Sequence, residues 1–348
     1  MLTLTKSLFA LMLGFISSTI FGLIAIPFLK KLKAGQNINI YVEAHRSKAG
    51  TPTMGGLIFI IPTIAITVFL LLTGKIEYSV NLMIVLFVFF SYALIGFLDD
   101  FISLRRKSNK GLTQFQKLLL QLIVALVFYV LFRQFTSGDS YLRISALGID
   151  WNLGWFYGVF ILFLLVGSSN AVNLTDGLDG LAGGLSAISF LAFGLIAMGS
   201  WWIEGNSDMG IFCFILVGSI MGFLVYNSNP AKVFMGDTGS LTLGLSMAFL
   251  AISYAMNNPL IKPFSEGAIV VSFATLIVPL FDVVRVVWIR YRSHQPFFMP
   301  DQNHIHHKFL RMGLSHYATM ALILALAFFL SFFNIIAVEY ISNNIVIF

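Results

Sequence analysis

Charged residues are scarce in this sequence. Asp, Glu, Lys and Arg together make up 10% of its 348 residues, whereas hydrophobic residues make up 58%. A soluble domain needs roughly 25% charged residues to cover its water-facing surface. The composition therefore excludes a soluble globular enzyme, a disordered chain and a collagen-like fibre, and it predicts an integral membrane protein.

Cysteine is almost absent as well. The single cysteine, Cys213, lies inside an apolar run, so we expect a small buried hydrophobic side chain and no disulfide within the chain. Basic residues outnumber acidic ones by 21 to 15. In a chain this apolar, the basic excess is typical of the cytoplasmic loops of a membrane protein, and it does not indicate nucleic-acid binding.

Long apolar runs are what the sequence does contain. Continuous runs of about 20 residues match helices that satisfy their own backbone hydrogen bonds in lipid. We predict about ten transmembrane helices, near residues 8–29, 57–72, 80–98, 118–135, 153–169, 181–199, 210–226, 240–256, 268–289 and 318–339. No repeat or interdomain linker interrupts them, so residues 1–348 are predicted to form one polytopic, all-α membrane domain.

Basic residues divide unequally between alternate loops of this arrangement. Most of the 21 Lys and Arg residues fall in one set of loops, which the positive-inside rule places in the cytoplasm. Both termini are then external. All six histidines and the aspartates of the motifs below fall on the cytoplasmic side, so any active site is predicted to face the cytoplasm.

Two adjacent carboxylates, Asp99 and Asp100, lie near the cytoplasmic end of the third predicted helix. Adjacent carboxylates repel each other, and at this helix end they also face the negative pole of the helix dipole. A bound cation or a shared proton would relieve both effects. The alternative is a solvated helix end without a ligand.

A polar run at residues 170–184 contains Asn173, Asp176 and Asp179 between several glycines. If the turn around Asp176 is helical, these three side chains share one face. No basic residue lies nearby in the sequence, and carboxylate and amide oxygens without counterions suit Mg²⁺ or a metal-bound sugar phosphate. The glycines allow either a close ligand approach or close helix packing.

Two glycine-flanked segments come before predicted helices. In residues 234–240, Asp237 is either a helix N-cap or a metal ligand beside backbone amides that can meet phosphate. Residues 48–56 give a basic, glycine-rich entry to a helix, which can hold an anion.

Three histidines, His304, His306 and His307, lie within four residues of the longest cytoplasmic loop. Zinc binding is one explanation, because zinc takes histidine ligands in a fixed geometry. Lys308 and Arg311 make the segment cationic, which favours phosphate neutralisation or proton donation. An inert solvated loop is the third alternative.

Taken together, these segments resemble the polyprenyl-phosphate N-acetylhexosamine-1-phosphate transferases of glycosyltransferase family 4, from about Lys30 to His316. The resemblance implies a multi-pass enzyme of the bacterial inner membrane, with the lipid bilayer as its surroundings. Such an enzyme moves a phosphosugar from a UDP-N-acetylhexosamine to undecaprenyl phosphate and releases UMP. It implies Mg²⁺ as cofactor, with Mn²⁺ as the alternative, allows a homodimer, and involves no nucleic acid.

Two branches of this family compete for the donor. Residues 48–56, 109–117, 173–182 and 229–243 look like the phospho-N-acetylmuramoyl-pentapeptide transferases, which form lipid I in peptidoglycan synthesis. Residues 297–309 look like the N-acetylglucosamine-1-phosphate transferases, because Lys308 replaces a histidine and His304 is added in front. The sequence therefore predicts UDP-N-acetylglucosamine as the leading donor, with the pentapeptide donor as the alternative.

The resemblance also implies roles for single residues. Asp237 and Asp176 would hold the metal. The catalytic group would comprise Asp99, Asp100, Asp237, His306 and His307. Substrate would be bound by Lys48, Thr53, Lys117, Asn173, Asp176, Gly177, Leu178, Asp179, Phe234 and His304.

Other classes of membrane protein fit less well. A transporter usually places polar residues at mid-membrane in two related halves, whereas these carboxylates gather at one face. An intramembrane aspartyl protease would need Gly-x-Gly-Asp, and Phe234 occupies the first glycine position. A noncatalytic scaffold would not need every one of these polar positions.

Overall fold

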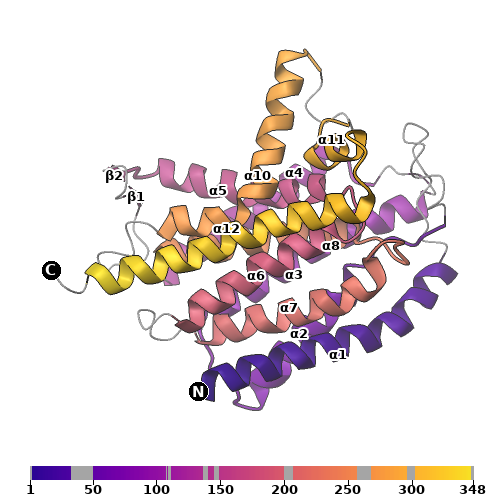
Figure 1. Cartoon of the computed structure of the whole chain (residues 1–348). Helices are drawn as coiled ribbons and strands as arrows, with labels where there is room; N and C mark the ends of the chain where they lie inside the picture. The colour runs from indigo at the N-terminus through magenta and orange to yellow at the C-terminus, as the bar shows by residue number, and fades with distance from the viewer. Residues whose placement is uncertain are drawn as a thin grey trace.

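The structure is a computed structural model, and it describes residues 2–32, 50–106, 108, 111–135, 140–144, 149–199, 207–256, 268–295 and 302–345. Long helices dominate this part of the chain (Figure 1). They are α1 (Leu2–Lys31), α2 (Leu57–Leu72), α3 (Val80–Arg105), α4 (Gln114–Phe135), α5 (Phe156–Thr175), α6 (Leu181–Gly199), α7 (Ser207–Asn227), α8 (Gly236–Met256), α10 (Ala268–Arg292) and α12 (His316–Ile345). Each predicted apolar segment coincides with one of them.

Six helical stretches are long and apolar enough to cross a membrane. They are Thr5–Lys31, Val80–Arg105, Gln114–Phe135, Phe156–Thr175, Asp208–Asn227 and His316–Phe333. This confirms a multi-pass, mainly α-helical membrane protein. Three points remain predictions: that each of the ten long helices spans the membrane, that both termini are external, and that the active face is cytoplasmic.

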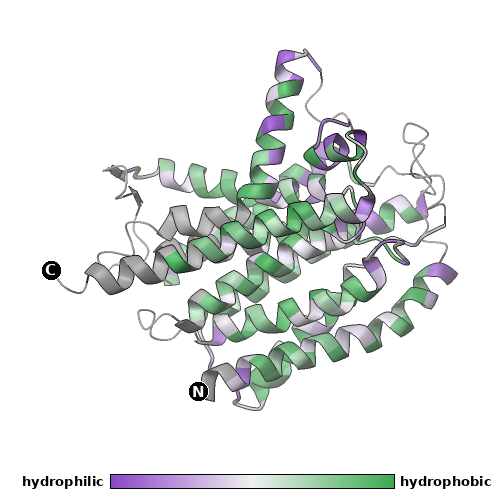
Figure 2. Cartoon of the chain, in the orientation of Figure 1, coloured by the Kyte–Doolittle hydropathy of each residue, from purple (hydrophilic) through white to green (hydrophobic). Residues whose placement is uncertain are grey.

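Hydrophobic residues cover the bodies of the helices, and hydrophilic residues gather toward the end of the bundle where the short helix α11 (Ile305–Arg311) lies (Figure 2). The second half of α10 stands away from the bundle in Figure 1, and Pro279 lies inside this helix. A proline within a helix removes a backbone hydrogen bond and favours such a bend.

Two short strands are a feature that the all-α prediction missed. β1 (Tyr141–Ile144) pairs antiparallel with β2 (Ile149–Asn152), and Tyr141 lies opposite Asn152. Both strands contain β-branched or aromatic residues, which favour extended backbone. They fall between two predicted membrane segments, in a stretch that hydropathy alone treats as a loop.

The core forms around α7, which packs most extensively against α1. Small residues allow this contact: a Cβ added at Gly218 would lie 2.0 Å from the carbonyl oxygen of Leu11, and one at Gly14 would lie 2.3 Å from that of Ile215. Close approach through glycines is the usual way for helices to pack in lipid, where the hydrophobic effect gives little drive for association.

Two close contacts bring the predicted motifs together. A Cβ at Gly96 would lie 2.2 Å from the carbonyl oxygen of Asp237, so α3 rests directly on the start of α8. The 52–56 segment runs beside the 234–235 segment, where Phe234 N donates to the Pro52 carbonyl and Gly55 N donates to the Phe234 carbonyl, both at 2.8 Å. The segment before α2 and the segment before α8 therefore belong to the same site.

Candidate active site

Asp237 lies at the centre of a polar cluster, in the first turn of α8. Its Oδ1 accepts a hydrogen bond from Asn173 Nδ2 at 2.8 Å, and its Oδ2 pairs with Lys117 Nζ. The same ammonium lies 3.3 Å from Asp99 Oδ1. Asp237 therefore faces the neighbouring helices α4 and α5 with its carboxylate, which argues against the helix-cap alternative.

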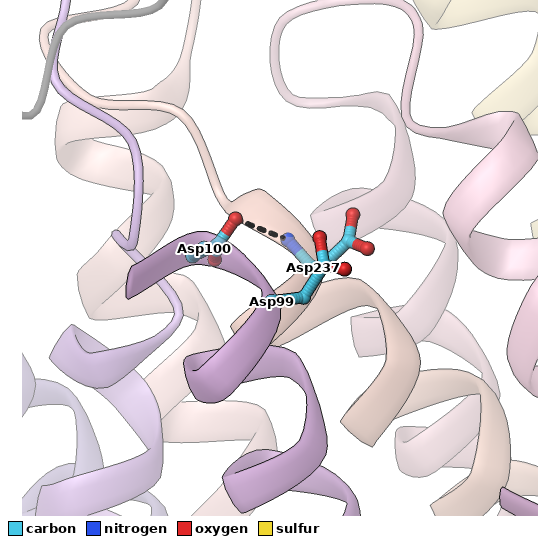
Figure 3. A group of neighbouring side chains, drawn as sticks. All are labelled: Asp99, Asp100 and Asp237. Carbon is cyan, nitrogen blue, oxygen red and sulfur yellow. Dashed lines mark hydrogen bonds between the residues drawn. The ribbon is translucent and has the colours of Figure 1, made fainter. Parts of the chain in front are cut away.

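The two adjacent aspartates of α3 point in different directions (Figure 3). Asp100 is buried, and its carboxylate accepts from Thr238 N at 3.0 Å, Thr238 Oγ1 at 2.6 Å and Asp237 N at 3.3 Å. It is therefore Asp100 that satisfies the free amides at the N-terminus of α8. Asp99 stays closer to the surface, beside Asp237.

Asp99 is held by the loop that follows α3. Its Oδ1 accepts from Leu112 N at 2.9 Å, and a Cβ at Gly111 would lie 2.6 Å from the Asp99 carboxylate. Only a glycine lets the loop approach this closely. The Asp99 carboxylate is thus fixed between a backbone amide and Lys117.

The carboxylates of Asp99, Asp100 and Asp237 form a group that could hold a metal ion, since one oxygen from each lies within 4.8 Å of the others. An all-oxygen donor set suits a hard divalent cation. Because Asp100 caps α8, Asp99 and Asp237 are the better placed ligands. Asp176 does not belong to this group of three among the described residues, so its predicted role as a metal ligand remains a prediction.

A cavity of about 210 Å³ opens beside Asp237. It brings together six of the predicted substrate-binding residues with Asp237 itself, although they come from two separate segments. The lining consists of Asn173, Asp176, Gly177, Leu178, Asp179, Asn227, Phe234, Met235, Gly236 and Asp237. Its mixed polar and apolar wall can receive both a charged group and a flat base.

The turn after α5 differs from the helical turn considered from the sequence. Thr175 ends the helix, Asp176 caps it with ψ 50°, and Gly180 has a positive φ of 79°. Asp179 is buried, and its Oδ2 accepts from Ala231 N at 3.2 Å. The two carboxylates therefore line the cavity from an irregular turn, because glycines here release the backbone from the helix.

Asp176 lies in a strongly negative environment. Removal from water, together with the charges of Asp237 and Asp179, raises the pKa of Asp176 from its ordinary value to about 7. Carboxylates crowded in this way repel each other until a cation or a proton neutralises them. The donor set and the electrostatics both favour a bound divalent ion beside this cavity.

His306 reaches the same turn from α11. It is buried, and a Cβ at Gly177 would lie 2.7 Å from its Nε2. Burial is the main cause that lowers the pKa of His306 to about 3; His307, His304 and His316 add to this effect, and Asp282 opposes it. His306 is therefore neutral at physiological pH and offers a hydrogen bond instead of a positive charge.

The histidine segment does not form a metal group among the described residues, where the group found consists of the three aspartates. The rings of His306 and His307 lie 4.2 Å apart, and those of His304 and His306 stack at 5.7 Å. His304 is buried, with Nδ1 2.8 Å from Asp282 Oδ2. Its predicted contact with substrate remains a prediction, but the ring is already committed to Asp282.

Two predicted residues belong to the entry of α2. Thr53 is buried, and a Cβ at Gly236 would lie 2.7 Å from its hydroxyl oxygen. Thr53 therefore packs against the start of α8. Lys48 lies outside the described residues.

Asp282 had no predicted role. The available signal was a lone carboxylate inside an apolar helix, which requires a partner.

Comparison with known proteins gives consistent matches. The model of "Glycosyl transferase family 4" matches residues 82–255, and signature 1 of the phospho-N-acetylmuramoyl-pentapeptide-transferases matches residues 48–60. Proteins named phospho-N-acetylmuramoyl-pentapeptide-transferase are similar to the chain: 46% identical over 246 residues in Bacillus licheniformis, 46% over 247 in Bacillus subtilis and 47% over 247 in Geobacillus thermodenitrificans. Each match covers 70% of this chain and 74% of the relative.

A cluster of carboxylates with one lysine, at the rim of a cavity in a helical membrane protein, is the chemistry that these matches lead one to expect. The chain belongs to glycosyl transferase family 4, as a phospho-sugar transferase of the bacterial inner membrane related to the phospho-N-acetylmuramoyl-pentapeptide-transferases.

Proposed function

We propose that this protein transfers phospho-N-acetylmuramoyl-pentapeptide from its UDP-linked donor to undecaprenyl phosphate, forming lipid I and releasing UMP. The observation that carries the chemistry is the Asp237 carboxylate, which lies between Lys117 and Asn173 at the rim of the cavity. The relatives support the choice of donor, because the three compared above share this name at 46–47% identity.

This proposal adopts the alternative donor instead of UDP-N-acetylglucosamine. The comparisons give no specific support to UDP-N-acetylglucosamine, the leading donor predicted from the sequence. That choice depended on His304 and Lys308, and the His304 ring is buried against Asp282. Of the two residues, only Lys308 is exposed to solvent.

The reaction exchanges one phosphorus–oxygen bond for another. An oxygen of the acceptor phosphate bonds to the β-phosphorus of the donor, the bond from this phosphorus to the bridging oxygen breaks, and UMP leaves with that oxygen. Both substrates are anionic, so the protein must offset negative charge throughout. Lys117 is the cation placed to do so, since its ammonium contacts both Asp99 and Asp237.

Asp237 and Asp99 would hold Mg²⁺, which supplies charge neutralisation and orientation for the diphosphate when bound. Phe234 and Leu178 give the cavity its apolar wall, which suits the uracil base. Asn173 keeps Asp237 in place through its amide hydrogen bond. His306 is neutral and its buried Nε2 has no hydrogen-bond partner among the described residues, so it would offer a hydrogen bond to substrate beside Gly177. Lys117 would then supply the phosphate-neutralising charge that was predicted for His306.

The direct test offers both donors in parallel to the purified full-length protein, with undecaprenyl phosphate and Mg²⁺, and measures UMP release and the lipid product. We expect robust turnover with UDP-N-acetylmuramoyl-pentapeptide, and loss of turnover when the metal is chelated. Turnover with UDP-N-acetylglucosamine alone would show that the protein is an N-acetylglucosamine-1-phosphate transferase. Turnover with neither donor would contradict the proposed reaction.

A further inference from the structure

Asp282 is a buried carboxylate in an otherwise apolar stretch of α10, three residues after Pro279. Its side chain is 5% exposed. A buried carboxylate destabilises the fold unless hydrogen bonds or charges compensate for the lost water. Its partners therefore show what the residue is retained for.

Both Asp282 oxygens hold the beginning of α11. Oδ2 lies 2.8 Å from His304 Nδ1, and Oδ1 accepts from Ile305 N at 2.9 Å. One turn further along α10, Arg285 Nη1 lies 3.7 Å from Oδ1 and donates to the Asn303 carbonyl at 2.7 Å. A single turn of α10 thus fixes the residues immediately before α11.

The segment held in this way places His306 behind the wall of the cavity beside Asp237. The His304 ring, fixed by Asp282, stacks on the His306 ring with 15° between their planes. His306 Nε2 in turn faces Gly177, which lines the cavity beside Asp176. Asp282, His304, His306 and Gly177 therefore form a series of neighbouring residues that ends at the cavity wall.

Ile305, Phe309 and Leu310 of α11 pack against a small apolar cluster that includes Leu178 and Ile323, but this packing is incomplete on the side of α10. An apolar cavity of about 460 Å³ lies between α10, α11 and α12, with Phe281, Phe309 and Leu326 among its lining residues. A helix of 7 residues is also too short to be stable by itself in water. The hydrogen bonds to Asp282 are therefore a main restraint on the position of His306.

We propose that Asp282 is a positioning residue for phosphosugar transfer, which holds His304 and the start of α11 so that His306 stands against Gly177 in the wall of the donor cavity. The proposal rests on the proposed function, because it takes that cavity to be the donor site. It predicts that a change at Asp282 affects turnover through His306, and not through a general loss of stability.

A double-mutant cycle in the full-length protein separates these two effects. Asp282→Asn keeps the shape of the side chain but removes its charge and one acceptor oxygen. We expect it to lower kcat about tenfold or more, with a smaller change in the donor KM, because a displaced His306 affects the reacting geometry. In a His306→Asn background, the same substitution should change kcat by less than about twofold.

Asp208 provides a matched control. It is a buried carboxylate that pairs with the Ser79 hydroxyl at the start of α3, while Asp99 lies about 30 Å further along the same helix. Asp208→Asn should lower thermal stability to a similar degree and leave kcat unchanged. If kcat falls equally in both variants, or if Asp282→Asn costs the same with and without His306, the proposal is overturned.

Two measures keep the test decisive. If Asp282→Asn does not fold, His304→Gln replaces it in the cycle, and additivity with His306→Asn then refutes the proposal. The cycle is run with whichever donor the wild type turns over. Failure with the pentapeptide donor would therefore count against the proposed function, while the cycle itself reports on Asp282.

Discussion

Asp100→Asn tests whether the two aspartates of α3 have separate tasks. Asp100 Oδ2 accepts from both the backbone nitrogen and the hydroxyl of Thr238, and Oδ1 faces the backbone nitrogen of Asp237 at 3.3 Å. An asparagine has only one acceptor oxygen. Its amide nitrogen would therefore face an N–H donor at the start of α8, whichever way the side chain turns.

The expected cost follows from these contacts. A hydrogen bond to a charged group contributes about 1.5–3 kcal/mol, and a negative charge at a helix N-terminus adds about 0.3–1 kcal/mol. We therefore expect Asp100→Asn to lower the free energy of unfolding by about 2–3 kcal/mol. Asp237→Asn should leave stability within about 1 kcal/mol of wild type, because it relieves repulsion among neighbouring carboxylates.

Activity should show the opposite order. Asp237→Asn exchanges an anionic oxygen for an amide at the proposed metal site, so turnover should fall by about 100-fold or more. Asp100→Asn should retain measurable turnover per folded molecule. Thermal unfolding in detergent, with UMP release on the same samples, measures both quantities. If Asp100→Asn is as stable as wild type and as inactive as Asp237→Asn, the capping role is wrong and Asp100 is catalytic.

The residues around the cavity and the loops give further expectations. Gly177→Ala places a methyl group 2.7 Å from His306 Nε2, so kcat should fall about tenfold, and an unchanged kcat would show that the ring moves aside freely. The pKa of His306 is about 3 in the fold but about 6.5 in the unfolded chain. Protonation below pH 6.5 therefore favours the unfolded chain, so the free energy of unfolding is highest above pH 6.5 and falls as the pH is lowered. By pH 5 the loss should be about 2 kcal/mol; thermal unfolding at pH 8 and pH 5 should show a smaller drop in His306→Asn, and an equal drop contradicts the assignment. Lys117→Met leaves Asp99 and Asp237 without their shared cation, so kcat should fall about 100-fold, and activity within twofold of wild type would exclude its role. Reporter tags at Asn109 and Asp139 should be cytoplasmic and external, and tags on the same side would overturn the orientation.

Hydropathy predicted the helices well because lipid leaves the chain few alternatives. A backbone in the hydrocarbon layer must satisfy its own hydrogen bonds, so a long apolar run has to be helical there. The segments 57–72 and 181–199 match α2 and α6 to the residue, although neither helix is among the six described stretches that are long and apolar enough to cross a membrane. The same signal weakens where a helix leaves the membrane, and α3 continues to Arg105 although its apolar run ends near residue 98.

The polar motifs predicted which residues gather at the site, but they did not predict which residues pair. Asp99 and Asp100 are adjacent in the sequence and look equivalent, yet one faces Lys117 and the other caps a helix that begins at Gly236. Such a difference arises from the approach of α3 to α8 across Gly96, which no local pattern contains. The two short strands were missed for a related reason, since alternation over four residues is too brief to separate a strand from a loop.

The predicted donor depended on a local departure from the pattern of the pentapeptide branch. His304 and Lys308 differ from the pentapeptide branch, and their place in a loop rich in histidine suggested contact with the sugar. In the fold, His304 turns inward because Asp282, on the preceding helix, needs a partner for its buried charge. The way α10 holds α11 thus explains the position of His304, and this residue does not by itself favour either donor. We therefore expect discrimination between donors to depend on exposed groups such as Lys308 and on the side chains that face the cavity from the turns after α5 and before α8.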